Sequence, residues 1–269
     1  MAVNTKINLS GLTLDNPVIP ASGTYGFGKE YVDFYDINIL GSISIKGTTV
    51  QRRKGNPQPR IAECYSGLIN SVGLENPGME NVIQKELKDL EKIYRKPVIA
   101  NISGFSVEEY VTLAREMDKV DNVGIIEVNI SCPNVDHGGL AFGTNADNVR
   151  ELTKKIKEVT TKPIYMKLSP NVTDIKEIAR AAEEGGADGI SLINTLMGMR
   201  IDINRRRPVI TNKKGGFSGP AIFPVALRMV YEVYEATDLP IIGIGGISSA
   251  EDVIEMMMAG ATAVQIGAA

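Results

Sequence analysis

The sequence is poor in the residues that build several common kinds of site, and each shortage excludes something. It has two cysteines, Cys64 and Cys132, too few for a disulfide scaffold, a cysteine-ligated zinc site or an iron–sulfur cluster. It has one histidine, His137, and no carboxylate cluster near the strand ends predicted below, which argues against a metal-dependent enzyme. We therefore predict no metal, and the scarcity of cysteine fits a reducing compartment.

Long apolar runs and an excess of positive charge are also missing. No apolar run approaches the ~18 residues of a membrane span, and residues 1–9 lack the basic and apolar regions of a signal peptide. The 29 Lys and Arg against 32 Asp and Glu give a net charge of −3, which leaves no positive field for a polyanion. We expect a cytoplasmic protein with no membrane and no nucleic-acid partner.

What the sequence does contain is a regular alternation of strand and helix patterns. Its 269 residues, 43% of them apolar, suffice for one large domain, residues 1–269. Short β-branched runs alternate with stretches whose apolar residues recur at helical spacing, which indicates βαβ units. The predicted strands are residues 18–21, 42–46, 98–101, 124–129, 164–167, 189–194, 241–244 and 263–266. The predicted helices are residues 80–94, 107–117, 147–160, 173–184, 224–235 and 250–258.

This alternation favours an α/β fold of the closed (β/α)8 TIM-barrel type over an open doubly wound sheet. Residues 243–246 read Gly-Ile-Gly-Gly and lack the later glycine of a dinucleotide-binding loop, which weakens the case for the open sheet. Before the first strand, apolar residues alternate on either side of Ser10-Gly11, which predicts a short N-terminal hairpin that could cap one barrel end. The sequence stops at Ala269, so we expect the eighth helix to be missing from this chain.

Polar residues or glycines follow the predicted strands, at the end where barrel active sites are built. Amides both donate and accept hydrogen bonds, so asparagines there suit a ring edge or an amide-bearing substrate. Glycines after the last two strands let backbone N–H groups approach a phosphate closely. We therefore predict a phosphorylated ligand with polar ring contacts. The residues at these ends are Ser22, Lys46, Asn101, Asn129, Lys167, Asn194, Gly245, Gly246 and Gly267.

Two lysines and one cysteine leave the chemistry open at this point. Lys46 and Lys167 could be Schiff-base nucleophiles, as in a lyase or a phosphosugar isomerase, or fixed positive charges facing an anion that forms during reaction. Cys132 lies just beyond a strand end on a proline-bearing loop, from which it could reach a ligand, whereas Cys64 has no comparable setting. The basic run Arg205–Arg207 lies in a predicted long loop after the sixth strand and indicates solvated charge.

Across essentially the whole chain, the motifs resemble those of the FMN-dependent dihydroorotate dehydrogenases. The resemblance implies oxidation of dihydroorotate to orotate in de novo pyrimidine biosynthesis, and a related FMN-dependent pyrimidine oxidoreductase is the nearest alternative. Residues 138–145, Gly-Gly-Leu-Ala-Phe-Gly-Thr-Asn, resemble the NAD-linked subtype. The other specific segments are residues 21–23, 45–48, 70–78, 129–134, 166–170, 193–195, 218–220 and 245–246.

The resemblance also implies roles for individual residues. Cys132 would be the catalytic base that takes the C5 proton while hydride passes from C6 to flavin N5. Lys167 would lie near the part of the flavin that gathers negative charge on reduction. The implied substrate-binding residues are Lys46, Asn70, Ser71, Val72, Gly73, Leu74, Asn129, Asn134, Asn194 and Thr195. The implied FMN-binding residues are Ser22, Lys46, Gly47, Asn101, Asn129, Lys167, Ile193, Gly219, Gly245, Gly246, Gly267 and Ala268.

A partner chain follows from the same resemblance. NAD-linked members pass electrons to a second subunit that carries FAD and a [2Fe-2S] cluster, and two cysteines here cannot ligate such a cluster. The resemblance implies a heterotetramer of two catalytic and two electron-transfer chains, built on a homodimer core. Ala268 departs from the family pattern, since a threonine is usual at its position in the phosphate site.

Overall fold

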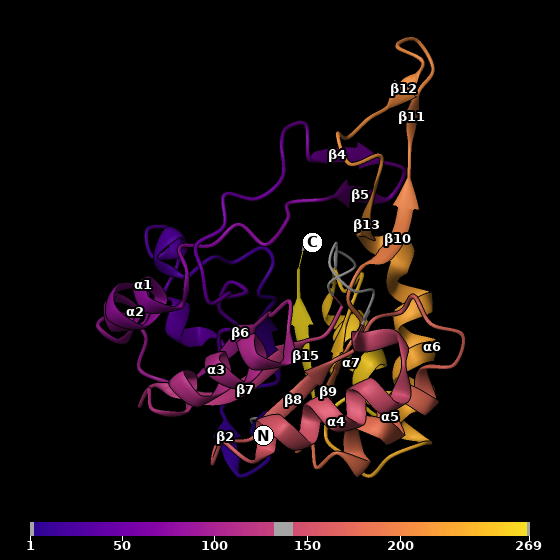
Figure 1. The fold of residues 1–269 in the computed structure, drawn as a ribbon. Coiled ribbons are helices and arrows are strands. Elements are labelled where there is room, and N and C mark those ends of the chain that lie inside the picture. The colour runs from indigo at the N-terminus through magenta and orange to yellow at the C-terminus, as the bar shows by residue number, and fades with distance from the viewer. Residues whose placement is uncertain (1–2, 132–141, 268–269) are drawn as a thin grey trace.

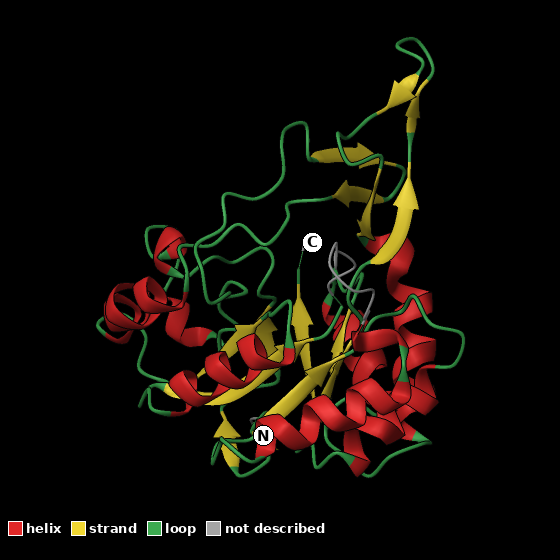
Figure 2. Ribbon diagram, in the orientation of Figure 1, coloured by secondary structure: helices red, strands yellow, loops and turns green. Residues whose placement is uncertain are grey.

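A parallel sheet forms the centre of the computed structural model, which describes residues 3–131 and 142–267. Its seven strands follow the order β3-β15-β14-β9-β8-β7-β6, and every pairing is parallel. Helices cover its outer face, so the α/β fold predicted from the alternation is confirmed (Figures 1 and 2). The strands are β3 (Val18–Pro20), β6 (Val98–Ile102), β7 (Val123–Asn129), β8 (Ile164–Lys167), β9 (Gly189–Leu192), β14 (Ile241–Ile244) and β15 (Ala263–Ile266).

The sheet closes into a barrel through residues 41–48, which lie between the edge strands β3 and β6. On one side, the Gly41 N–H donates to the carbonyl of Val18 at 2.9 Å. On the other, the Ile45 N–H donates to the carbonyl of Ile99 at 3.0 Å. The prediction of a strand at 42–46 is nevertheless wrong in detail, because only isolated bridges form there, at Ser44 and Thr48. Hydrogen bonds to both neighbours give this segment the position of the second strand of a (β/α)8 barrel without regular strand geometry.

Polar caps explain where several helices begin. The Ser106 hydroxyl accepts the Glu109 N–H at 3.3 Å, and Ser249 and Asp252 cap each other's backbone N–H groups in a capping box. The predicted helices are confirmed, with ends shifted by up to three residues. They are α1 (Met79–Asn81), the π-helical turn η3 (Val82–Glu86) and α2 (Leu87–Glu91), which follow one another directly, then α3 (Val107–Asp118), α4 (Ala146–Lys157), α5 (Ile175–Glu184), α6 (Phe223–Tyr234) and α7 (Ala250–Met258). Short 3₁₀ turns are η1 (Lys29–Tyr31), η2 (Ile37–Ile39), η4 (Phe142–Thr144) and η5 (Pro220–Ile222).

The predicted N-terminal hairpin is present and closes the lower end of the barrel, where the strands begin. Its strands β1 (Ile7–Leu9) and β2 (Leu12–Leu14) are antiparallel. Leu9 and Leu14 are fully buried in a cluster with inward-facing side chains of the barrel strands. The Ser10 hydroxyl lies 3.0 Å from the Tyr165 hydroxyl and donates to the carbonyl of Asp188 at 2.8 Å. We call this hairpin, β1 and β2, the plug. Apolar burial and two polar contacts hold it in place.

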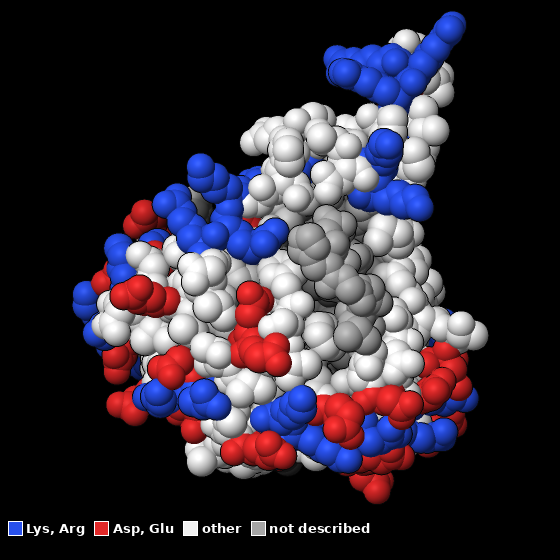
Figure 3. Space-filling view, viewed as in Figure 1, with Lys and Arg blue, Asp and Glu red and all other residues white. Residues whose placement is uncertain are grey.

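An antiparallel sheet that the sequence analysis did not predict rises from the upper end of the barrel, where the strands finish (Figures 1 and 2). We call it the arm. Its strands β4 (Ile61–Cys64), β5 (Gly67–Asn70), β10 (Leu196–Met199) and β13 (Lys214–Ser218) pair in the order β10-β13-β5-β4. The long loop predicted around Arg205–Arg207 is corrected to a hairpin of β11 (Ile201–Asp202) and β12 (Arg207–Pro208), which puts a cluster of basic side chains at the arm's tip (Figure 3).

Candidate active site

The upper ends of the barrel strands bring the predicted polar residues together beneath the arm. Asn129 and Lys167 are the last residues of β7 and β8, and Asn101 is the last but one of β6. Asn194 follows β9 by two residues. Parallel strands end at the same edge of a sheet, so residues distant in the sequence become neighbours there. The structure thus places the strand-end residues at one end of the barrel, as the order of elements predicted.

A buried carboxylate that the sequence analysis missed lies at the centre of this layer. Glu127, on β7, is completely buried. Its Oε2 accepts from Asn101 Nδ2 at 2.5 Å and lies 3.4 Å from Lys167 Nζ, while its Oε1 accepts from Gln265 Nε2 at 2.7 Å. The Ser44 hydroxyl lies 3.5 Å from Oε2. Side chains from four segments of the barrel wall therefore converge on one carboxylate.

The environment of Glu127 keeps it ionised. Burial by itself would raise the pKa of this carboxyl, but the positive charge of Lys167 and hydrogen bonds from Asn101 and Gln265 outweigh burial, so its pKa lies below the ordinary value of 4.5. Glu127 and Lys167 are thus an ion pair inside the barrel, with Lys167 only 6% exposed. A lysine paired in this way is a fixed cation rather than a free amine.

Asn101 leaves a hydrogen-bond acceptor unused. Its Nδ2 is bound to Glu127, whereas its Oδ1 is buried and has no partner among the described residues. A Cβ at Gly47 would lie 2.8 Å from that oxygen, so only glycine leaves the space beside it open. Buried polar atoms in folded proteins are nearly always satisfied, so an unsatisfied acceptor facing this space marks a place for a ligand N–H.

A second set of contacts joins the barrel to the base of the arm. Asn194 Nδ2 donates to Asn129 Oδ1 at 3.1 Å, and Asn194 Oδ1 accepts the Thr195 N–H at 2.7 Å. Thr195 packs against the backbone of Gly216, where a Cβ would meet the threonine hydroxyl at 2.0 Å. The Gly216 carbonyl in turn lies 3.4 Å from Asn70 Nδ2. Four residues predicted to bind one substrate are therefore connected through a single array, at the junction of two sheets.

Residues 71–74, predicted to bind the substrate with their backbone, leave β5 in a tight turn. Gly73 and Leu74 both have positive φ, at 80° and 55°, a conformation that costs Leu74 energy. Asn56 holds the turn by donating its side-chain amide to the carbonyl of Ser71 at 2.9 Å. The Ser71 hydroxyl is buried without a partner among the described residues. This segment is a preformed polar turn facing the space that also holds the unused acceptor of Asn101, since Leu74 lies beside Gly47.

Lys46 lies at the rim of the same space. Its Nζ is 3.4 Å from the carbonyl of Gly23. Burial lowers the pKa of Lys46, Glu75 opposes that change and Arg60 adds to it. Unlike Lys167, this amine has no carboxylate within ion-pair distance among the described residues. The two lysines are thus differently placed: Lys167 is held by a buried anion, whereas Lys46 contacts a backbone carbonyl.

Two of the three glycines at the predicted phosphate loops, Gly245 and Gly246, are explained by packing without a ligand, whereas a Cβ at Gly267 would make only an ordinary contact of 3.9 Å with Ala21. A Cβ at Gly246 would lie 2.5 Å from the backbone nitrogen of Phe223, and one at Gly245 would lie 2.9 Å from Ala226, both in α6. Gly219 packs equally closely on Gly67 of the arm. The positive φ values of Gly246 (72°), Gly245 (127°) and Gly219 (116°) also require glycine. Close packing accounts for these three glycines, while the position of Gly245 next to Ile193 keeps them near the site.

The remaining predicted residues divide into two groups. Ser22 and Gly267 follow the paired strands β3 and β15 and lie side by side at the upper end. Cys132, Asn134 and Ala268 fall outside the described residues, as does His137. Their predicted roles stay predictions. Ser131, the residue before Cys132, is described, and its N–H donates to Asn129 Oδ1 at 3.2 Å.

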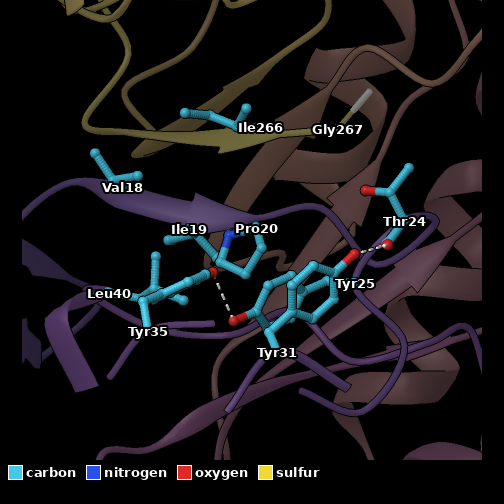
Figure 4. Close-up of a pocket in the computed structure, with 10 residues that line it drawn as sticks. All are labelled: Val18, Ile19, Pro20, Thr24, Tyr25, Tyr31, Tyr35, Leu40, Ile266 and Gly267. Carbon is cyan, nitrogen blue, oxygen red and sulfur yellow. Dashed lines mark hydrogen bonds between the residues drawn. The ribbon is translucent and has the colours of Figure 1, made fainter. Parts of the chain in front are cut away.

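A separate cavity of about 360 Å³ lies beside β3 and β15 and is distinct from this site (Figure 4). Stacked rings of Tyr25 and Tyr31 line it, together with Tyr35, whose hydroxyl is 2.8 Å from that of Tyr25. Among the described residues predicted for the site, Gly267 alone borders it. In residues 3–131 and 142–267, no three His, Cys, Asp or Glu side chains gather as metal ligands, and no helix is long and apolar enough to cross a membrane.

Comparison with known proteins gives a consistent result. The family model described as dihydroorotate dehydrogenase matches residues 4–269. A protein of Bacillus cytotoxicus named dihydroorotate dehydrogenase B (NAD(+)), catalytic subunit, is 57% identical over 264 residues, which cover 98% of this chain and 85% of the relative. A protein of the same name from Halalkalibacterium halodurans is 56% identical over 263 residues, covering 98% of this chain and 86% of the relative. These matches confirm the resemblance drawn from the motifs.

Proposed function

Because the chain belongs to the dihydroorotate dehydrogenase family of enzymes, we propose that it is the catalytic subunit of an NAD-linked dihydroorotate dehydrogenase. It would oxidise dihydroorotate to orotate in pyrimidine biosynthesis. The observation that carries the proposal is the upper end of the barrel, where a paired cation, an unsatisfied acceptor and an array of amides face one space. A ring with hydrogen-bonding edges meets these groups better than a simple phosphosugar does.

The residues at this end fit a flavin, and we propose FMN as the cofactor. The buried Oδ1 of Asn101, which has no partner in residues 3–131 and 142–267, can accept a ring N–H, and Gly47 keeps the space beside it open. Lys167 supplies positive charge next to that acceptor. Ser22, Gly219, Gly245, Gly246, Gly267 and Ala268 would hold the rest of the cofactor. When bound, FMN supplies the two-electron acceptor to which the hydride from C6 of dihydroorotate is transferred.

The substrate would lie between that cofactor and the base of the arm. Asn70, Asn129, Asn194 and Thr195 already form one connected array, so a planar substrate can exchange their mutual hydrogen bonds for its own. Asn134 and the backbone of residues 71–74 would complete the binding set. Lys46 would bridge substrate and cofactor, since its amine faces the same space. Amides that donate and accept in turn can bind both the carboxylate and the imide-like edge of dihydroorotate.

We assign the proton transfer to Cys132. A thiol can remove the C5 proton when its pKa is brought toward the working pH and water is excluded. Its neighbour Ser131 is held at the end of β7 by the Asn129 side chain, so Asn129 would anchor Ser131 in addition to binding the substrate. Lys167, paired with Glu127, would act as a fixed cation and not as a Schiff-base nucleophile.

The name of the relatives, a catalytic subunit, implies that a second subunit accompanies them, and we propose the same for this chain. FAD and a [2Fe-2S] cluster would lie on that partner, because this chain has two cysteines and such a cluster takes four ligands. The electrons would pass through the partner to NAD. Two catalytic and two electron-transfer chains around a homodimer core would make the full assembly.

An anaerobic absorption spectrum of the purified chain, before and after addition of dihydroorotate, tests the proposal. The expected result is a yellow protein whose flavin band bleaches when the substrate is added. Borohydride treatment in the presence of phosphosugars provides the control for the lyase alternative, because trapping of a lysine would indicate a Schiff base. A colourless protein that takes up no added FMN would contradict the assignment, and bleaching by other pyrimidines in preference to dihydroorotate would move the substrate to a related oxidoreductase.

A further inference from the structure

The buried carboxylate of Glu127 has none of the roles assigned above, yet it occupies the centre of the polar layer. We propose that Glu127 is a positioning residue, which orients the Asn101 amide and holds the Lys167 ammonium so that the ligand meets one free acceptor beside one cation. The inference rests on the proposed function, because it explains how the same site is prepared for its flavin.

The contacts of Glu127 show how the two groups are held. Oε1 is used by Gln265 at 2.7 Å, which fixes the plane of the carboxylate from β15. Oε2 is left to Asn101 on β6 and Lys167 on β8, at 2.5 Å and 3.4 Å. One oxygen therefore anchors the carboxylate and the other organises the two residues that face the ligand space.

Glu127 determines which end of the Asn101 amide is available. An asparagine presents a donor at one end and an acceptor at the other. Turning the amide over would place two oxygens against each other in a buried site, which is costly. The donor end is therefore kept on Glu127, and the acceptor end, next to Gly47, has no partner in the part of the chain that the structure describes. A ligand N–H is the group that this arrangement accepts.

Glu127 also provides the charge that lets Lys167 remain a buried cation. Asn101, Lys167, Gln265 and Ser44 face the carboxylate from β6, β8, β15 and residues 41–48, and of these Lys167 carries the charge. A buried ammonium without an anion loses its proton or leaves the interior. Lys167 Nζ lies 3.4 Å from Glu127 Oε2 and 3.4 Å from Gln265 Oε1, so one of its three N–H groups is left for the ligand.

Four variants of the chain test this role by titration of the FMN-free protein with FMN. Glu127→Gln and Lys167→Met should each weaken FMN binding by about tenfold or more, since hydrogen bonds to charged groups are involved. The double variant should bind FMN less weakly than the product of the two single effects predicts, because part of the effect of Glu127 is exerted through Lys167. Tyr165→Phe is the matched control: Tyr165 lies two residues before Lys167 on β8, is buried, and should leave FMN affinity unchanged.

The pH dependence separates positioning from a general structural role. In Glu127→Gln the Lys167 ammonium loses its counter-charge and should give up its proton more easily, so raising the pH should weaken FMN binding by this variant more than by the parent chain. Lys167→Met should abolish this slope. The proposal would be overturned if the loss of FMN affinity in the double variant equalled the product of the two single losses. It would also be overturned if the FMN affinity of Glu127→Gln did not change with pH. If Glu127→Gln does not fold, Glu127→Asp replaces it: weaker binding with a level profile is expected, and a sloping profile would overturn the inference.

Failure of the proposed function is distinguishable from failure of this inference. A parent chain that binds no FMN would contradict the function. Urea unfolding of the FMN-free variants would still test the pair. The decrease in the midpoint urea concentration should be smaller for the double variant than the sum of the decreases for the two single variants. Additive losses would overturn the role of Glu127 as the counter-charge of Lys167.

Discussion

The two ends of the barrel interior differ in the chemistry of their side chains: the lower end is apolar and the upper end is polar and charged. At the lower end, Leu9 and Leu14 of the hairpin meet Ile99, Ile125 and Ile242 in a fully buried apolar cluster. At the upper end, the same strands present a carboxylate, an ammonium, amides and hydroxyls, some without partners in the described part of the chain. At the lower end, burial of apolar side chains stabilises the fold. At the upper end, burial of polar and charged groups that are arranged for a ligand lowers the stability.

This contrast shows how a barrel separates folding from chemistry along the length of each strand. Tyr165 and Lys167 are two residues apart on β8, so both point into the barrel. Tyr165 bonds to the plug, and burial raises its pKa to about 12, so it remains a neutral hydroxyl. Lys167 pairs with Glu127 and faces the site. Substitutions at the two ends should therefore separate activity from stability.

The largest expected effect is at the upper end and is on rate. Cys132→Ala should slow flavin reduction by dihydroorotate about 10²- to 10⁴-fold, the usual contribution of a general base, while FMN remains bound. Anaerobic stopped-flow absorbance measures the rate. Cys132→Ser is the matched variant and should recover part of the activity at raised pH. Near wild-type reduction rates in the alanine variant would remove Cys132 from the mechanism.

A smaller effect, on stability, is expected for Glu127→Gln. Removing one partner of a buried ion pair should cost about 3–5 kcal/mol at neutral pH. The lowered pKa of Glu127 means that its contribution is complete above about pH 4.5 and is lost as the pH falls through the lower folded value. The gap between parent and variant in urea unfolding should therefore narrow in acid, and a gap independent of pH would contradict the ionised state of Glu127.

At the lower end, Leu14→Ala should reduce the free energy of unfolding by about 2–5 kcal/mol, because it opens a cavity in the plug. The variant should still bind FMN and react at an unchanged rate below its unfolding transition. Urea unfolding and flavin titration check the two halves of this prediction. Loss of FMN affinity in a folded Leu14→Ala protein would mean that the two ends are coupled.

The smallest effect is expected for Tyr165→Phe. It removes one buried hydroxyl contact with Ser10, which should cost about 1 kcal/mol. The matched variant Ser10→Ala removes the other side of the contact and also frees the Asp188 carbonyl, so it should cost somewhat more. Thermal unfolding of both variants provides the measurement, and a larger loss in Tyr165→Phe would show that the hydroxyl has a further role.

The sequence predicts the barrel well because its signals are local. Apolar strands alternate with amphipathic helices, and each prediction depends on about ten adjacent residues. The arm escaped prediction because its strands have four or five residues, contain Gly67, Gly198, Gly215 and Gly216, and pair across large sequence separations, as Gly216 does with Asn70. The prediction of a strand at residues 42–46 was wrong in detail, because the segment bonds to both neighbouring strands but forms only isolated bridges with them.

The site shows the same division. Strand-end asparagines and lysines could be found because their positions follow from the strand boundaries. Glu127 was missed within the strand 124–129, although its distance of two residues from Asn129 puts both on the same face of β7. A charged residue at an inward-facing position of a buried strand is the signal that could have revealed it. The partners of Glu127 come from three other strands, so no local sequence pattern predicts them.

The pairing of β3 with β15 also governs the order of events during synthesis. Val18 pairs with Val264, and Ser10 of the hairpin donates to the carbonyl of Asp188, so β3 finds its final neighbour only after β15 has been synthesised. Until then its edge and the leucines of the hairpin are exposed to other chains. Closing such a long loop is slow, and this edge stays open to aggregation until β15 has been made.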